Sequence, residues 1–167
     1  MTYYAKKQRY ILPNQTSDYQ TVTVTAGRVY LLLFEVTDQP VNVDAVSIGV
    51  GTVSGTARVG IYGPIANSDT GEDCAGAALI VESAATALTN NTGNIISFTS
   101  TRLAPGRYYL AMQFSAADPI RRAIPATNVL GWMKQYDRSG GYGAFTTPCP
   151  TTANSLATWG AVRVTGA

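Results

Sequence analysis

The chemistry open to this 167-residue chain is limited first by its lack of histidine. Without an imidazole, the sequence offers no Ser-His-Asp or Cys-His catalytic arrangement and none of the usual histidine-containing zinc sites. Cleavage of a glycosidic bond needs only two carboxylates, held on opposite sides of that bond. The ten acidic residues are spread over turns and strands, and no spacing singles out such a pair. We therefore expect a protein that is not an enzyme and that uses no cofactor.

The densest group of carboxylates lies at residues 69–73, which read Asp-Thr-Gly-Glu-Asp. This run lacks the regular alternation of oxygen ligands that a calcium-binding loop requires, so we interpret it as a solvated turn and expect no metal site. The two cysteines, Cys74 and Cys149, have neither metal-ligand spacing nor the pattern of a disulfide framework. We expect two reduced thiols, as in an intracellular product, and a single bridge between them is the open alternative.

An aromatic, glycine-rich run at residues 136–145 admits three interpretations. Its rings could stack on sugars, or they could contact an apolar patch on a partner protein. The third interpretation is structural: the run is a loop whose tyrosines cap the edge of the fold, and this is the one we prefer. Trp132 and Trp159 lie in strand-like stretches, where tryptophan belongs more often to the core than to a binding site.

The fold that must position these residues is organised around residues 107–114. The preceding Pro105 and Gly106 form a turn signal, because proline presets φ and glycine tolerates positive φ. In residues 107–114 larger apolar side chains occupy every second position, and this period of two predicts a half-buried central strand. One face carries the larger apolar residues and is expected to look into the core: Tyr108, Leu110, Met112 and Phe114.

Similar alternation recurs along the chain, between short turns rich in glycine, proline and asparagine. Residues 28–36 are apolar on both faces, so we expect both faces to be covered. Residues 41–50 change their apolar phase near Asp44, which is typical of a β-bulge. Helical patterns are nearly absent. The sequence therefore predicts an all-β fold, an antiparallel and jelly-roll-like β-sandwich over residues 18–167.

Residues 1–17 are expected to form an extended N-terminal arm. The arm is too apolar for a free tail, and its basic residues could meet carboxylates on a partner. We expect it to contact that partner through aromatic, aliphatic and basic side chains: Tyr3, Tyr4, Lys6, Lys7, Arg9, Tyr10, Ile11 and Leu12.

The overall composition argues against several classes of partner. Only 13% of the residues are charged and the formal net charge is +2, which gives no electrostatic basis for binding nucleic acid or an anionic membrane. The 46% share of hydrophobic residues excludes a disordered chain. No apolar run approaches the ~18 residues that span a bilayer, and the polar first ten residues contain no signal-peptide pattern.

Three strand-and-turn motifs follow one another between about residues 41 and 122. They read Thr56-Ala-Arg-Val-Gly-Ile-Tyr62, Gly76-Ala-Ala-Leu-Ile-Val-Glu82 and Leu103-Ala-Pro-Gly-Arg-Tyr-Tyr-Leu-Ala111. In this order and spacing they resemble a β-sandwich module found on the virions of tailed bacteriophages. The chain departs from that module at Tyr109, where the module often has tryptophan. The positions carried over are structural and not catalytic: Arg58, Gly60, Tyr62, Pro105, Gly106 and Tyr108.

This resemblance implies a virion surface protein, either a capsid decoration (cement) protein or the tip of a tail fibre. We expect the former, because the chain shows no long shaft and its apolar arm suits a subunit that clamps onto a shell. Such a protein would be made in the host cytoplasm and would bind the major capsid protein on the capsid exterior, as a homotrimer according to the resemblance. Under the alternative, the same domain would contact a host-surface glycan.

Overall fold

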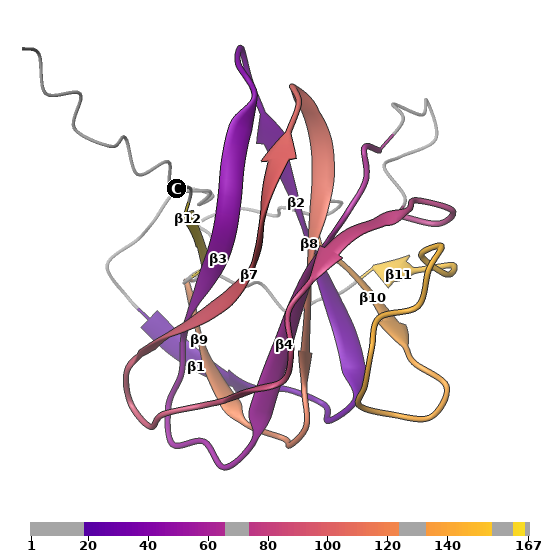
Figure 1. Cartoon of the computed structure of the whole chain (residues 1–167). Coiled ribbons are helices and arrows are strands. Elements are labelled where there is room, and N and C mark those ends of the chain that lie inside the picture. The colour runs from indigo at the N-terminus through magenta and orange to yellow at the C-terminus, as the bar shows by residue number, and fades with distance from the viewer. Residues whose placement is uncertain (1–18, 66–73, 124–132, 155–161, 166–167) are drawn as a thin grey trace, which may run out of the picture.

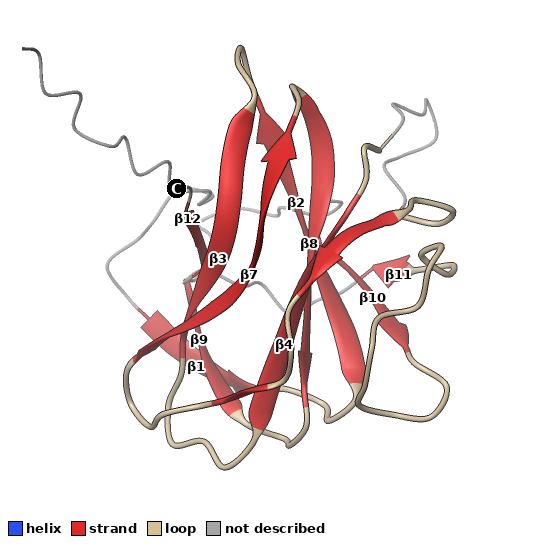
Figure 2. Cartoon of the chain, in the orientation of Figure 1, coloured by secondary structure: helices blue, strands red, loops and turns tan. Residues whose placement is uncertain are grey.

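The computed structural model describes residues 19–65, 74–123, 133–154 and 162–165, and within them the chain contains strands and no helix (Figure 2). All pairing between these strands is antiparallel. The strands are β1 (Tyr19–Thr23), β2 (Arg28–Val36), β3 (Val41–Gly49), β4 (Thr56–Tyr62), β5 (Leu79–Glu82), β6 (Thr86–Ala87), β7 (Gly93–Leu103), β8 (Gly106–Phe114), β9 (Pro119–Ala123), β10 (Met133–Asp137), β11 (Ala153–Asn154) and β12 (Val162–Thr165).

The strands form two packed layers. The larger sheet has the order β11-β10-β2-β8-β4-β5, with β6 also paired to β4, and the smaller sheet has the order β12-β3-β7. Strands β1 and β9 pair as a separate ribbon, which joins the end of β3 through a bridge between Val50 and Ile120. Figure 1 shows β3 and β7 crossing the face of the larger sheet. The predicted antiparallel β-sandwich is confirmed, whereas its likeness to a jelly roll stays a prediction.

Strand β8 lies at the centre of the larger sheet, as the sequence predicted. It pairs with β2 on one side and β4 on the other, so that Leu110 lies opposite both Leu32 and Ile61. The expectation that β8 is only half-buried is wrong. Tyr109 and Gln113, on the face away from the smaller sheet, are as fully buried as the core face, with 0% of each side chain exposed.

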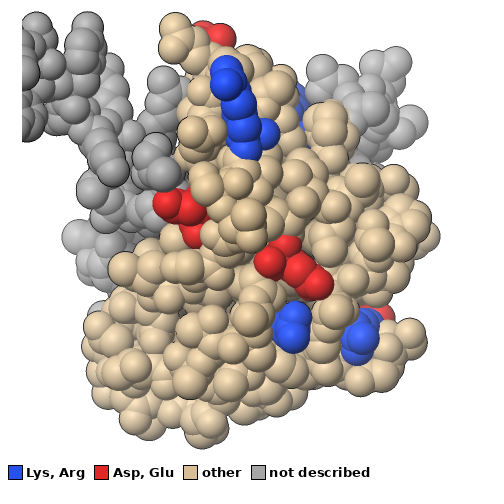
Figure 3. Space-filling view, viewed as in Figure 1, with Lys and Arg blue, Asp and Glu red and all other residues tan. Residues whose placement is uncertain are grey.

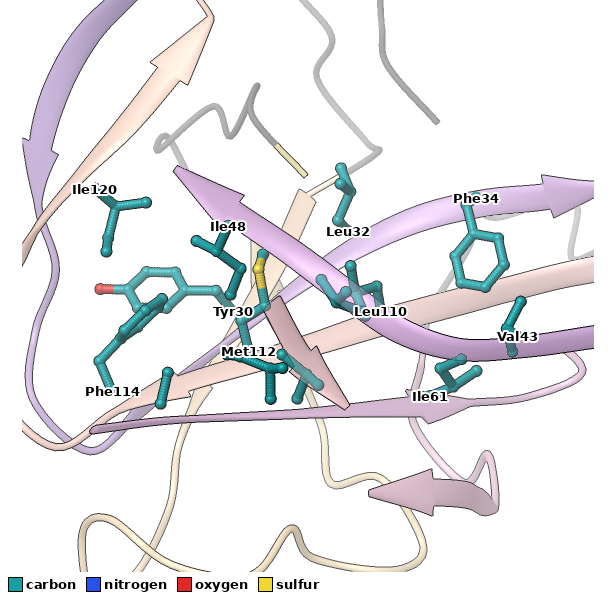
Figure 4. Close-up of a cluster of buried hydrophobic side chains, with 14 of the residues drawn as sticks. Tyr30, Leu32, Phe34, Val43, Ile48, Ile61, Leu110, Met112, Phe114 and Ile120 are labelled. Atoms are coloured by element: carbon teal, nitrogen blue, oxygen red, sulfur yellow. The ribbon is translucent and has the colours of Figure 1, made fainter. Parts of the chain in front are cut away.

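The inner cluster is the set of buried apolar side chains between the two sheets. Alternate residues of each strand point into it, because successive side chains of a strand leave on opposite faces. The ring of Phe34 stacks on the ring of Tyr108, with 5.6 Å between their centroids. Figure 4 shows the heart of this cluster, to which β2, β3, β4, β8 and β9 contribute Tyr30, Leu32, Phe34, Val43, Ile48, Ile61, Leu110, Met112, Phe114 and Ile120.

The outer cluster lies on the opposite face of the larger sheet. It is closed mainly by two irregular segments, the turn at residues 74–77 before β5 and residues 138–150 between β10 and β11. We call residues 138–150 the cover. Strand β2 is thus covered on both faces, as its sequence predicted. The buried members of the outer cluster are Val29, Leu31, Leu33, Tyr62, Ile65, Cys74, Tyr109, Ala111, Tyr136, Phe145 and Cys149.

The predicted bulge in β3 is also present. The pairing of β3 with β7 shifts register between Val43 and Ala45. Val43 before the bulge and Val46 after it both belong to the inner cluster in spite of the change from odd to even apolar positions, because the bulge adds one residue to β3.

Candidate functional site

The residues expected to contact a partner all belong to the arm at positions 1–12, which lies outside the described residues. Their expected role stays a prediction. The same holds for the carboxylate run at residues 69–73 and for Trp132 and Trp159. The candidate site that the structure does describe is the aromatic run of the cover and the face of the larger sheet beneath it.

The positions carried over from the phage module gather where β4 and β8 lie side by side. Glycine is required at two places there. A Cβ atom on Gly60 would lie 2.9 Å from Cδ2 of Phe145, and one on Gly63 would lie 2.7 Å from Cδ1 of Tyr108. The hydroxyl of Tyr108 donates a hydrogen bond to the carbonyl of Ala104 at 2.8 Å, which closes the turn between β7 and β8. Gly60 and Gly63 therefore allow close packing, and Tyr108 holds the turn.

Gln113 fastens the cover to the sheet. Its Nε2 donates to the carbonyl oxygens of Gly27 and Gly141, at 2.7 and 3.1 Å. Its Oε1 accepts a hydrogen bond from the backbone N–H of Gly143 at 3.1 Å. An amide buried this completely would be destabilising without partners, and the cover supplies two of the three. The sequence pattern did not predict this role, although the apolar Tyr109 and Ala111 on the same face of β8 were a signal of a second covered face.

A pair of buried tyrosines makes the second fastening. The hydroxyl of Tyr62 donates to the carbonyl of Thr146 at 2.5 Å and lies 2.9 Å from the hydroxyl of Tyr136. Because each hydroxyl has one hydrogen, Tyr136 must donate to Tyr62 in this arrangement. Burial raises the pKa of Tyr136 to about 12 and that of Tyr62 further. Both rings therefore stay neutral at physiological pH.

Two further contacts hold the cover in shape. The carboxylate of Glu82 accepts a hydrogen bond from the backbone N–H of Phe145 at 3.0 Å, and its Oε2 lies 3.9 Å from a guanidinium nitrogen of Arg58. Arg138 donates to the carbonyl oxygens of Ala144 and Gly141, at 2.7 and 2.9 Å. Glu82 and Arg138 are thus engaged in internal hydrogen bonds, whereas Nε of Arg58 is buried without a hydrogen-bond partner among the described residues.

The aromatic rings of the run are turned toward the protein. Phe145 is buried and meets the ring of Tyr62 edge-on, with 6.4 Å between centroids. Tyr142 is half-buried, and its hydroxyl accepts a hydrogen bond from Thr56 at 2.9 Å. This favours the structural interpretation of the run over stacking on sugars. The expected position is corrected, since the run covers a face of the sheet and not its edge.

Asp118 is buried and accepts hydrogen bonds from two segments, although an Asp-Pro step is typical of a simple turn. Its Oδ1 accepts a hydrogen bond from the backbone N–H of Ser54 at 2.9 Å, and its backbone carbonyl accepts one from the N–H of Val24 at 3.1 Å. Its Oδ2 is buried without a hydrogen-bond partner among the described residues. Asp118 thereby ties the turn before β4 to the ribbon of β1 and β9.

The two cysteines both belong to the outer cluster. Both are thiols, and both are buried. Cys149 is 2% exposed, although its position between two prolines is typical of a surface segment. Nothing in the spacing of the two cysteines indicates that they share this cluster, because the strands between them decide it.

The outward surface carries few charges. Figure 3 shows charged side chains scattered over the visible face, with no patch of either sign. An exposed ion pair joins Arg28 and Asp137, whose Nε and Oδ1 lie 2.6 Å apart. Within the described part of the chain, no three residues of the metal-ligating types are grouped to hold an ion, and no helix is long and apolar enough to cross a membrane.

Comparisons of the chain with protein-family models, with curated proteins and with solved structures found no match. The function is therefore inferred from the residues and their geometry.

Proposed function

We propose that this protein is a non-enzymatic structural component of a bacteriophage virion, a capsid decoration subunit that binds the outside of the assembled shell and stabilises it. The proposal is supported by the three motifs and by one structural observation. The polar and aromatic groups of the cover are engaged in holding the cover on the sheet. A rigid domain with a largely neutral surface suits a protein that binds by shape.

The stabilisation would work by mass action. A subunit that binds assembled shell, and not free capsid protein, stabilises the shell by RT ln(1 + [L]/Kd), about 2.7 kcal/mol per site at a concentration of 100 Kd. A jelly-roll-like homotrimer seated on a local three-fold axis would multiply the contacts.

The arm at residues 1–12 would supply part of this contact. Its tyrosines are of the residue type that concentrates binding energy at interfaces. Burying a few of them, at ~25 cal/mol per Å², would contribute several kcal/mol before ordering costs. Its lysines and Arg9 would mainly set the association rate and its salt dependence.

The test uses shells assembled from the major capsid protein encoded in the same genome and lacking any decoration. The full chain is added, occupancy is measured by co-sedimentation, and shell disruption is followed on heating. We expect saturable occupancy and a higher disruption temperature.

Two full-length variants refine this test. One changes Tyr3, Tyr4 and Tyr10 to serine, and the other changes Lys6, Lys7 and Arg9 to serine. We expect the first to lower occupancy at every salt concentration, and the second to lose affinity mainly at low salt. Wild-type occupancy by both variants would remove the arm from the interface. Failure of the wild type to bind shells, together with binding to host cells that a purified surface glycan competes away, would replace the proposal with the tail-fibre alternative.

A further inference from the structure

We propose that Cys74 and Cys149 form a disulfide bond when the folded protein meets an oxidising disulfide compound, and that this bond locks the cover to the turn before β5. The bond would form in any oxidising setting, whether or not the chain belongs to a virion.

The backbone brings the two cysteines to either side of one residue. The N–H of Ala77 donates to the carbonyl of Cys74 at 2.9 Å, and the carbonyl of Ala77 accepts the N–H of Cys149 at 2.8 Å. The N–H of Gly76 also donates to the carbonyl of Cys149, at 2.8 Å. Gly76 has a φ of 81°, so the turn folds Cys74 back toward the segment that carries Cys149. The two cysteines thus lie on segments that adjacent backbone hydrogen bonds hold together, which favours a disulfide because the bond needs Cα atoms roughly 4.4–6.8 Å apart.

The side chains are also buried in the same cluster. Cys74 and Cys149 are 0% and 2% exposed, and both belong to the outer cluster. The outer cluster also holds Tyr62 and Tyr136, whose pKa values are raised mainly by burial. The two cysteines and the two tyrosines therefore share one buried region.

The reaction is a thiol–disulfide exchange in two steps. The thiolate of one cysteine attacks a sulfur of the oxidant RSSR, forms a mixed disulfide and releases RS⁻. The thiolate of the second cysteine attacks the protein sulfur of this mixed disulfide, closes the Cys74–Cys149 bond and expels the second RS⁻. The protons lost by the two cysteines pass to the two RS⁻ ions. Overall, two protein thiols and one RSSR give one protein disulfide and two RSH.

The fold should favour this bond by linkage. A cross-link between residues far apart in the sequence removes conformational freedom from the unfolded chain and therefore stabilises the folded one. By the same cycle, folding stabilises the disulfide against reduction. Burial makes the exchange slow in the native state, because the thiolates must become accessible before they can react.

The experiment measures the thiol–disulfide equilibrium of the full chain in glutathione redox buffers, once folded and once in concentrated urea. Samples are quenched with acid, remaining thiols are alkylated, and intact masses are read. We expect the folded chain to lose two hydrogens without gaining glutathione, with an equilibrium constant about 100-fold above that in urea. The melting temperature should rise by about 5–10 °C on oxidation and return on reduction with dithiothreitol.

Slow reaction of buried thiols is separated from absence of the bond by refolding the urea-unfolded chain in the same buffers. The Cys74→Ser and Cys149→Ser variants are the matched controls, and each should show no oxidant-dependent change in melting temperature. Refolded wild type that keeps two thiols, or that carries one glutathione on each cysteine, would overturn the proposal. So would an equilibrium constant equal to that in urea.

Discussion

The inner and outer clusters cover the two faces of the same sheet, but they are closed in different ways. The inner cluster is closed by β3 and β7, whose backbone groups pair with each other. The outer cluster is closed mainly by irregular chain, which has no such ladder. A buried backbone group needs a partner, so side chains of the sheet must supply what strand pairing does not. This is why Gln113 and Tyr62 are buried beneath the cover and bonded to its backbone.

The difference indicates two levels of stability. Loss of packing in the inner cluster affects both sheets, and so affects global unfolding. Loss of a fastening under the cover affects a segment that can open while the sandwich stays folded.

The largest effect should come from Leu110→Ala in the inner cluster. Leu110 is 1% exposed at the centre of β8, and the cavity left by the substitution should lower the free energy of unfolding by about 3–5 kcal/mol. Urea denaturation measures the change. Ile95→Ala, at a side chain that is 68% exposed, is the matched control and should stay within about 0.5 kcal/mol of wild type. Equal midpoints for the two variants would mean that β8 does not organise the core.

The second effect concerns Gln113→Leu, which keeps the side chain's bulk and removes its three hydrogen bonds. We expect a loss of about 2–3 kcal/mol, because buried backbone groups of the cover and of Gly27 lose their partner. The cover should also become cleavable by trypsin after Arg138 under native conditions. Gln39→Leu, at an exposed turn position, is the control. A variant as resistant to trypsin as wild type would show that Gln113 does not fasten the cover.

The third effect is a loss of stability at high pH. In the folded state the pKa of Tyr136 is raised to about 12 and that of Tyr62 is raised further, so above pH 10 the unfolded chain releases protons that the folded chain keeps. Their contribution is fully present below pH 10 and should fall by about 1.4 kcal/mol per pH unit for each tyrosine as the pH rises toward 12. Denaturation at a series of pH values measures this slope, and Tyr136→Phe should remove one tyrosine's share. An unchanged slope in that variant would contradict the buried pair.

The smallest effect should come from the exposed ion pair of Arg28 and Asp137. The hydrogen bond from Arg28 lowers the pKa of Asp137, so the pair's contribution is present above the ordinary carboxyl pKa and is lost as the pH falls through the folded value. The side chain of Asp137 is 72% exposed, so Asp137→Asn should change the free energy of unfolding by only about 0.2–1 kcal/mol, and less in high salt. Asp38→Asn is the control, at a turn position with positive φ that asparagine tolerates. A larger change in the free energy of unfolding would show that this ion pair stabilises the fold as much as the buried contacts under the cover do.

Much of the fold was predictable from the sequence, because strand pairing leaves a local pattern. The period of two in residues 107–114 identified the core face of β8, and the apolar faces of residues 28–36 predicted a strand covered twice. The phase change near Asp44 located the bulge in β3. Each of these features depends on residues only a few positions apart.

The candidate site was less predictable. The run at residues 136–145 was recognised as unusual and its structural interpretation was preferred, but its place over the sheet face was not predicted. Gln113 was taken as an outward residue of a half-buried strand. Its burial depends on a cover that follows it by more than twenty residues and reaches it only after β10 has paired with β2.

The positions of the central strands and their apolar faces could be predicted from the sequence, since both follow from the alternation of side chains along an extended chain. What lies against the second face of the larger sheet depends on the tertiary structure. The fold brings Cys74 and Cys149 into one cluster, joins the hydroxyls of Tyr62 and Tyr136, and buries Asp118 beside the turn before β4. These contacts join distant segments through irregular chain, where no periodicity links one partner to the other, so they arise only when the sheet order brings the segments together.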